Sequence, residues 1–243
     1  MQKHICPFAL WRPWEPAIRQ PSFQKTQVIL HTMVGNLKNG VVGTGATGHW
    51  KAKGLESTFI ILLDGTLLQL LYSEQRADAN TDANRRAISV ETEDNDQPDT
   101  MLWTDAQVSS ILKLIAWCHR THDIPLRVCP AHDEPGIGYH TLFGESPRHN
   151  PWLYKDAKTC PGKNRKKQFH SVIEPRLASL KGWDPTTEAL GAAAQAEVPA
   201  LIAGASGAVP LRPREPAGLP QRRRVERRTA GRSDRRGRTN SRP

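Results

Sequence analysis

Short apolar runs that end in polar residues predict the first strands of the chain. Residues 26–32 form a β-branched and apolar run that ends on His31 and Thr32, as expected for a strand buried in a sheet. His31 should then stand at the strand end, where side chains reach a cleft. The glycine-rich residues 35–48 predict a loop, and residues 126–129 predict another short strand.

Three more apolar runs predict the rest of the sheet. Residues 59–63 and 66–71 flank Asp64-Gly65, and because Asp-Gly supplies the positive φ of a tight turn, these runs predict a β-hairpin. In residues 87–92, apolar and polar side chains alternate. This alternation places Glu91 on the face opposite the apolar side chains.

Helical spacing of apolar residues begins after Thr104 and continues to about Thr121, with Thr104 and Gln107 as a capping box. Residues 165–180 predict a last helix. The intervening loop, residues 130–159, is long for a compact domain, which indicates function or disorder. Together these elements predict an α/β fold in which helices flank a central, mostly mixed β-sheet.

Composition divides the chain into three parts. Residues 1–25 are rich in proline and tryptophan and predict an irregular arm, and residues 26–180 hold the periodic elements of one folded domain. Residues 181–243 contain thirteen Lys/Arg and six Asp/Glu, a net charge of +7 out of +10 for the chain. With a single aromatic residue they cannot organise a core, so they predict a disordered, basic Ala/Pro/Arg-rich tail.

Nothing in the sequence predicts export or membrane insertion. Prolines and charged residues interrupt the apolar residues near the N-terminus, so no signal peptide is expected, and no run reaches membrane-spanning length. The four cysteines are too few for a disulfide framework. Cys118 and Cys129 are expected to be buried thiols rather than a disulfide pair.

Candidate metal ligands occur in two short motifs. Cys160 lies in Lys158-Thr159-Cys160-Pro161-Gly162, and His140 closes Gly136-Ile137-Gly138-Tyr139-His140. Thiolate and imidazole are zinc ligands, and Lys158 places a cation beside them. His31 is the candidate third ligand, and spacing alone does not separate His140 from His132. The remaining histidines considered are interpreted as surface or hydrogen-bonded residues: His4, His119, His122, His149 and His170.

The order of these motifs resembles that of one enzyme family. It is similar to the zinc-dependent N-acetylmuramoyl-L-alanine amidases of the peptidoglycan-recognition superfamily, and most closely to endolysin amidase domains of actinobacterial phages. The resemblance runs from about residue 28 to residue 169. It is carried by Leu30-His31-Thr32, residues 59–69, residues 84–91, Trp103-Thr104 with its helix, and the two motifs that contain His140 and Cys160.

The resemblance implies a zinc site. Its ligands would be His31, His140 and Cys160, with His132 as the fallback for the second histidine. Two imidazoles and one thiolate would leave a fourth position open for water, as in other catalytic zinc sites. Each neutral imidazole would also need an acceptor for its second nitrogen.

The resemblance also implies roles for four other residues. Glu91 would move the proton of the attacking water and Lys158 would stabilise the oxyanion. Thr32 and Asn84 would be substrate-binding positions, with holding its loop as the alternative role of Asn84. Residues 56–58 read Glu-Ser-Thr where many relatives have Tyr-His or Ser-x-His, so the tyrosine that assists some phage amidases is absent and the mechanism depends more on Glu91.

The implied function is that of an endolysin. It would hydrolyse the amide between N-acetylmuramic acid and L-alanine of the peptidoglycan stem peptide during host lysis. The alternative is a catalytically inactive peptidoglycan-binding module of the same fold, against which the presence of Cys160 counts. A specific nucleic-acid-binding protein ranks low, because residues 1–180 contain no groove-reading motif.

The resemblance further implies where such a protein would act. It would be made in the host cytoplasm, without membrane insertion, and would reach the cell wall through a separate pore-forming partner. The basic tail could add electrostatic contact with anionic wall polymers, although a purely solubilising tail is an equal alternative.

Overall fold

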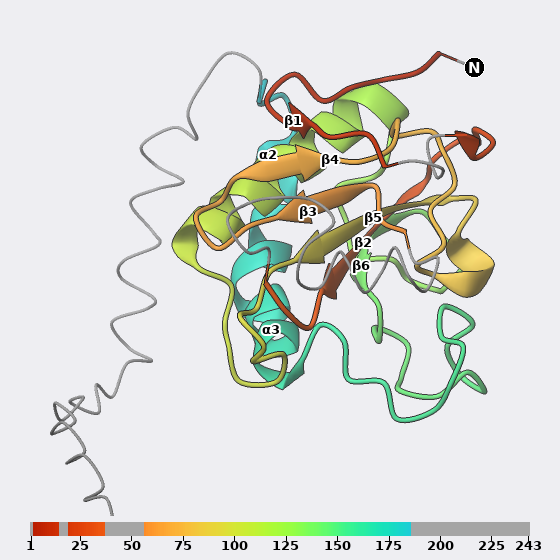
Figure 1. Cartoon of the computed structure of the whole chain (residues 1–243), viewed down its shortest axis with the longest axis vertical. Coiled ribbons are helices and arrows are strands. Elements are labelled where there is room, and N and C mark those ends of the chain that lie inside the picture. Colours follow the sequence, from red (N-terminus) through yellow and green to blue (C-terminus); the bar gives the residue numbers. More distant parts are fainter. Residues whose placement is uncertain (1, 15–18, 37–55, 186–243) are drawn as a thin grey trace, which may run out of the picture. The chain divides into compact units, whose positions relative to one another are not determined.

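A six-stranded sheet lies at the centre of the structure (Figure 1). The computed structural model describes residues 2–14, 19–36 and 56–185. Within this part the strand order is β1-β4-β3-β5-β2-β6, and β3–β4 is the one antiparallel pair. The strands are β1 (Leu10–Trp11), β2 (Gln27–Thr32), β3 (Phe59–Ile61), β4 (Leu67–Gln69), β5 (Ala87–Thr92) and β6 (Gly136–Tyr139). The predicted mixed sheet with helices is confirmed.

Helices and helical turns surround this sheet. The two α-helices among the described residues are α2 (Asp105–His122) and α3 (Lys163–Gln168). A π-helical turn, Phe169–Ile173, continues directly from α3. Single 3-10 turns are formed by Thr81–Ala83, Glu174–Arg176 and Ala178–Leu180.

The two faces of the sheet pack against different structures. On one face, Val28, Leu30 and Ile88 join a large core with apolar residues of α2 and with Phe169. On the other face, Ile29 packs with Trp152 of a long loop, in a separate cluster. The helices therefore cover one face, and loops cover the face on which the odd-numbered residues of β2 and β5 lie.

The hairpin and the capping box form as predicted. β3 and β4 are joined by a turn in which Gly65 has a φ of 84° and Leu62 N–H donates to the carbonyl of Thr66. Thr104 Oγ1 accepts from Gln107 N–H at 3.1 Å and donates to the carbonyl of Leu63 at 2.7 Å. The start of α2 is thus fastened to the hairpin by one hydroxyl group.

Two predicted elements differ from the structure. Residues 126–129 do not form a strand, because only Val128 makes a bridge, to Ile137. The strand in this region is β6, which lies within the predicted loop of residues 130–159 and pairs with β2. The predicted last helix is α-helical only as far as Gln168, and Pro175, which has no N–H to donate, lies in the tighter turns that follow.

Several other predictions concern the chain's ends and its thiols. Cys118 and Cys129 are buried free thiols, as expected. The irregular arm includes one short strand, β1, which pairs with β4. Residues 37–48 of the predicted loop and 186–243 of the predicted tail lie outside the described residues, so those predictions and the domain boundaries remain predictions. No helix in the described part is long and apolar enough to cross a membrane.

Gly162 provides a test of how the Cys160 loop is packed. Its φ is 102°, and a Cβ atom there would lie 1.7 Å from the carbonyl oxygen of Pro98. We expect Gly162→Ala to lower the free energy of unfolding by about 3 kcal/mol or more, because backbone strain and steric overlap add. Urea unfolding measures this change.

Gly182 is the matched control. Its φ is also positive, at 81°, but a Cβ atom added there would have no other atom within 4 Å. Gly182→Ala should therefore cost only about 1–2 kcal/mol, the strain of a left-handed residue. Equal losses for the two variants would show that the contact with Pro98 contributes nothing.

Candidate metal centre and cleft

Three parallel strands bring polar side chains to one edge of the sheet. His31 of β2 is the register partner of Glu91 of β5, so the two side chains lie on the same face. β6 pairs with β2 up to Leu30, and His140, the next residue after β6, donates its N–H to the carbonyl of Leu30 at 3.1 Å. The carboxyl ends of β2, β5 and β6 therefore deliver His31, Glu91 and His140 to one place.

Cys160 completes a group that could bind a metal. One ligand atom each from His31, His140 and Cys160 lies within 4.8 Å of the others. Cys160 Sγ is 3.6 Å from His31 Nδ1 and accepts a hydrogen bond from Thr32 N–H at 3.4 Å. Two imidazoles and a thiol sulfur form a donor set suited to zinc, so the residues present fit the metal that the family implies.

Hydrogen bonds orient both imidazole rings. His31 Nε2 donates to Asn80 Oδ1 at 2.7 Å, and His140 Nε2 donates to the carbonyl of Trp152 at 2.9 Å. In each ring Nδ1 is therefore the unprotonated nitrogen, whose lone pair can bind a metal. These are the acceptors that the sequence analysis required but could not identify.

Burial keeps both rings neutral at neutral pH. It lowers the pKa of His31 well below its ordinary value, and the proximity of His140 lowers it further. Burial likewise lowers the pKa of His140 to about 4. Since a metal binds the neutral imidazole, neither ring has to lose a proton first.

The thiol of Cys160 differs from the imidazoles in this respect. Burial, followed by the nearby Glu91, raises the pKa of Cys160 to about 12. Thr32 N–H, Lys158 and Arg165 act in the opposite direction. A metal ion that binds here would therefore displace the thiol proton.

Glu91 is a partly buried carboxyl group, with a side chain that is 14% exposed, and it has unused hydrogen-bonding capacity. Its Oε1 is 4.0 Å from His31 Nδ1, and its Oε2 is buried without a hydrogen-bond partner. Burial, and then the charge of Asp94, raise the pKa of Glu91 to about 8. Such a group, beside a candidate metal centre, can accept and donate a proton near neutral pH.

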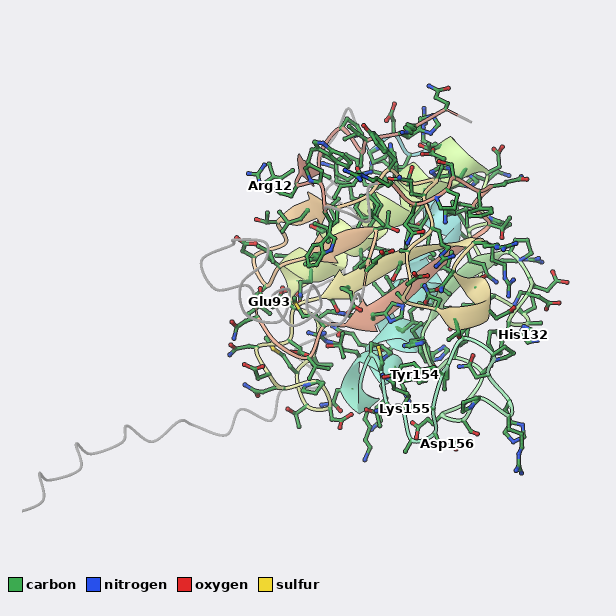
Figure 2. All side chains as sticks on the ribbon, turned by 45° about the vertical axis from the view of Figure 1, so that its right-hand side comes forward. Arg12, Glu93, His132, Tyr154, Lys155 and Asp156 are labelled. Carbon is green, nitrogen blue, oxygen red and sulfur yellow. The ribbon has the colours of Figure 1, made fainter. Side chains whose placement is uncertain are left out.

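One cleft of about 730 Å³ contains this group. Every predicted site residue lines it except His132: these are His31, Thr32, Asn84, Glu91, His140, Lys158 and Cys160. Tyr154 and Lys155 also line it and lie side by side in Figure 2. Lys158 Nζ lies 4.6 Å from the centre of the Tyr154 ring.

His132 lies elsewhere. Figure 2 shows it apart from Tyr154 and Lys155, and it is not part of any group of potential metal ligands among the described residues. Its ring contacts Phe143, and its carbonyl accepts hydrogen bonds from Gln27 and Trp152. The geometry thus favours His140 over His132 as the second histidine.

Thr32 belongs to a buried network behind the cleft. Its Oγ1 donates to Asp94 Oδ2 and accepts from Arg165 Nη1 at 2.7 Å. Arg165 is fully buried and also donates to the carbonyl of Glu93 at 2.7 Å. Because its hydroxyl is engaged in this way, a substrate contact by Thr32 remains a prediction.

Asn84 is similarly engaged. Its Oδ1 accepts from the N–H groups of Ala79 and Asn80 at 3.1 and 2.6 Å, and its Nδ2 donates to Asp78 at 3.0 Å. These bonds support the loop-holding alternative, since they place Asn80 beside His31. A direct substrate contact by Asn84 remains a prediction.

Sequence reasoning missed several of these residues. Asn80 lies in a loop without periodicity, and the acceptor at Trp152 is a backbone carbonyl, so neither carries a sequence signal. Arg165 reads as one more cation in a basic helix, and only its complete burial distinguishes it.

Comparisons with known proteins identify the family of this chain. The family model described as N-acetylmuramoyl-L-alanine amidase matches residues 22–163, and the chain belongs to this family, Amidase_2. A search of the curated proteins found no match.

Solved structures share the fold at low sequence identity. The endolysin N-acetylmuramoyl-L-alanine amidase LysCS from Clostridium intestinale URNW is 17% identical, with a TM-score of 0.50, over 71% of this chain and 99% of that chain. Peptidoglycan recognition protein-LE, solved in complex with tracheal cytotoxin, is 11% identical, with a TM-score of 0.50, over 68% and 94%. At these identities the likeness supports the fold alone.

Asn80 offers a test of ring orientation. We expect Asn80→Ala to weaken zinc binding by about 10–100-fold, the usual effect of removing the group that orients a ligand histidine. Competition with a chromogenic chelator measures the affinity. Asn164→Ala is the control, because Asn164 Nδ2 donates only to the exposed carbonyl of Thr100; an equal loss in both variants would contradict the role of Asn80.

Proposed function

We propose that this chain is a zinc-dependent amidase that cleaves the bond between N-acetylmuramic acid and L-alanine of the peptidoglycan stem peptide. The observation that carries the proposal is the convergence of His31, His140 and Cys160 within 4.8 Å, in the same cleft as Glu91 and Lys158. Membership of the amidase family supports the substrate class.

The residues around the cleft divide the chemistry between them. Zinc, when bound, would supply a Lewis acid and a water molecule of lowered pKa. Glu91, whose Oε2 has no protein partner, would take the proton of the attacking water and pass it to the leaving nitrogen. Lys158, on the cleft wall, would stabilise the negative charge that develops on the carbonyl oxygen.

Residues 56–58 supply no tyrosine to the cleft. Ser57 and Thr58 are buried, and Ser57 Oγ donates to backbone carbonyls of the sheet. Glu56 lines the cleft and accepts from Gln20. The proton transfer proposed here therefore rests on Glu91.

We further propose that the enzyme is an endolysin of an actinobacterial phage, made in the host cytoplasm and released to the wall by a pore-forming partner. The motif order supports this, and the fold of LysCS, itself named an endolysin, is consistent with it. Electrostatic contact of the basic tail, residues 181–243, with anionic wall polymers belongs to the same proposal.

The alternative is an inactive peptidoglycan-binding module. Its supporting observation is the shared fold of peptidoglycan recognition protein-LE, whose solved complex contains a peptidoglycan fragment. An inactive module has no need for a carboxyl group such as Glu91, with a buried oxygen that has no hydrogen-bond partner, beside three potential metal ligands. The amidase is therefore the proposal that the site supports best.

Product analysis tests the reaction. Peptidoglycan from an actinobacterium, digested with the zinc-loaded protein, should release free stem peptides that begin with L-alanine, and mass spectrometry detects them. Glycan fragments with intact stems would indicate a glycosidase instead. Binding to the wall without any released peptide would support the inactive module.

Two substitutions separate metal binding from proton transfer. Glu91→Gln should retain zinc while turnover falls by roughly 10²–10⁴-fold, because only the proton carrier is lost. Cys160→Ala should lose the zinc ion of the cleft together with turnover. Metal content and release of stem peptide are measured on the same samples.

Glu93→Gln is the control for the carboxyl group. Glu93 is two residues further along, does not line the cleft, and accepts from Leu63 N–H through Oε2. In Figure 2 it lies well away from Tyr154 and Lys155. Wild-type turnover in Glu91→Gln would remove Glu91 from the mechanism.

A further inference from the structure

A second group of potential metal ligands lies outside the cleft. His4 of the N-terminal arm, Glu74 of the loop after β4 and His122 at the end of α2 each place one ligand atom within 4.8 Å of the others. β4 runs antiparallel to β3, which is parallel to β5. The loop after β4 is therefore at the end of the sheet opposite to the carboxyl ends that carry His31 and Glu91.

Hydrogen bonds fix the arm so that His4 faces this group. The buried Gln69 accepts from Cys6 N–H at 2.6 Å and donates to the carbonyl of His4 at 3.0 Å. His4 N–H donates to Glu74 Oε2 at 3.0 Å, and Ser73 N–H donates to the carbonyl of His4. These hydrogen bonds to its backbone position His4 independently of the contact that its ring makes.

Both imidazole rings point at one carboxylate oxygen. His4 Nδ1 contacts Glu74 Oε1, and His122 Nε2 is 3.9 Å from the same atom. The side chains of Glu74 and His122 are only 4% and 6% exposed, whereas that of His4 is 31% exposed. The group is buried on the protein side and open to water along His4.

We propose that His4, Glu74 and His122 form a second site for a divalent cation such as zinc, which joins the N-terminal arm to the end of α2. Two imidazoles and a carboxylate are zinc donors, and bond lengths of about 2.0–2.2 Å place ligand atoms about 3–4 Å apart. The His4–Glu74 contact would have to lengthen, whereas the separation of 3.9 Å between His122 Nε2 and Glu74 Oε1 already lies in this range. Water from the open side would supply the fourth ligand.

A positive charge near this group is engaged by other partners. The buried Lys25 directs its Nζ at the carbonyls of Ala87 and Arg85, at 3.0 and 3.2 Å. Ser73 Oγ lies 2.9 Å from His122 Nε2 and is a further oxygen at the site. The metal-free explanation is a His4–Glu74 ion pair that needs no cation, and it is an outcome of the test.

Zinc counting in variants distinguishes the two sites. The full chain, stripped with a chelator, reloaded with zinc and desalted, should hold two zinc ions, and Cys160→Ala should hold one. A His4→Gln/His122→Gln double variant should also hold one, and the triple variant none. Elemental analysis of the protein measures these numbers.

A matched control is available in another histidine–glutamate pair. His170 Nδ1 contacts Glu174 Oε2 at 2.6 Å on the exposed side of the last helical segment, without a third ligand. His170→Gln should therefore keep two zinc ions. A loss of zinc in this variant would mean that exposed histidines account for the count and would overturn the proposal.

The possible results separate this inference from the proposed function. One zinc in the wild type and none in Cys160→Ala would overturn the second site and leave the amidase centre in place. One zinc in both proteins, lost in the double variant, would support the second site and contradict the cleft as a metal centre.

Cobalt(II) provides a measurement that does not depend on how the double variant folds. A cobalt ion bound to a thiolate shows a ligand-to-metal charge-transfer absorption that an imidazole–carboxylate site lacks. Cys160→Ala should bind one cobalt ion per chain without this absorption, and wild type should bind two with it. Saturation of the wild type at one cobalt ion would contradict the proposal.

Discussion

The parallel pairing of β2 with β5 and β6 is the constraint on which the cleft depends. Parallel strands end at the same edge, and the pairing of His31 with Glu91 puts their side chains on the same face. The hydrogen bond from His140 N–H to the carbonyl of Leu30 positions the third side chain, that of His140. A shift of one residue in any of these pairings would turn a site residue into the helical core.

Buried charge around the cleft is balanced within the fold. Glu91, Asp94 and Cys160 lie close together, and Arg165 enters from α3 to bond Thr32 and the carbonyl of Glu93. Burial lowers the pKa of Arg165 and the neighbouring acidic groups raise it, which leaves a pKa of about 10. The guanidinium therefore keeps its charge at neutral pH. One cation that is held by the backbone therefore stabilises several acidic groups without filling the cleft.

The two histidine groups differ in where the carboxylate lies. In the cleft, the rings are anchored outward, to Asn80 and the carbonyl of Trp152, which leaves Glu91 unpartnered beside them. At the other end of the sheet, the carboxylate of Glu74 lies between the rings of His4 and His122 and is their shared partner. The first arrangement leaves a group free for chemistry, and the second uses all of its groups to hold the chain together.

The sequence by itself determined the elements whose signals are local. Apolar runs, the Asp64-Gly65 turn and the Thr104 capping box predicted β2 to β5 and α2, and the alternation in residues 87–92 already placed Glu91 opposite the core. Strand β6 was not predicted because residues 136–139, two of which are glycine, carry little strand propensity of their own. Only the pairing of β6 with β2 distinguishes His140 from His132. The acceptors at Asn80 and Trp152, the buried Arg165 and the group around Glu74 join residues 48 to 133 positions apart or use backbone atoms. Such contacts depend on how the strands are ordered in space, and so only the tertiary structure decided them.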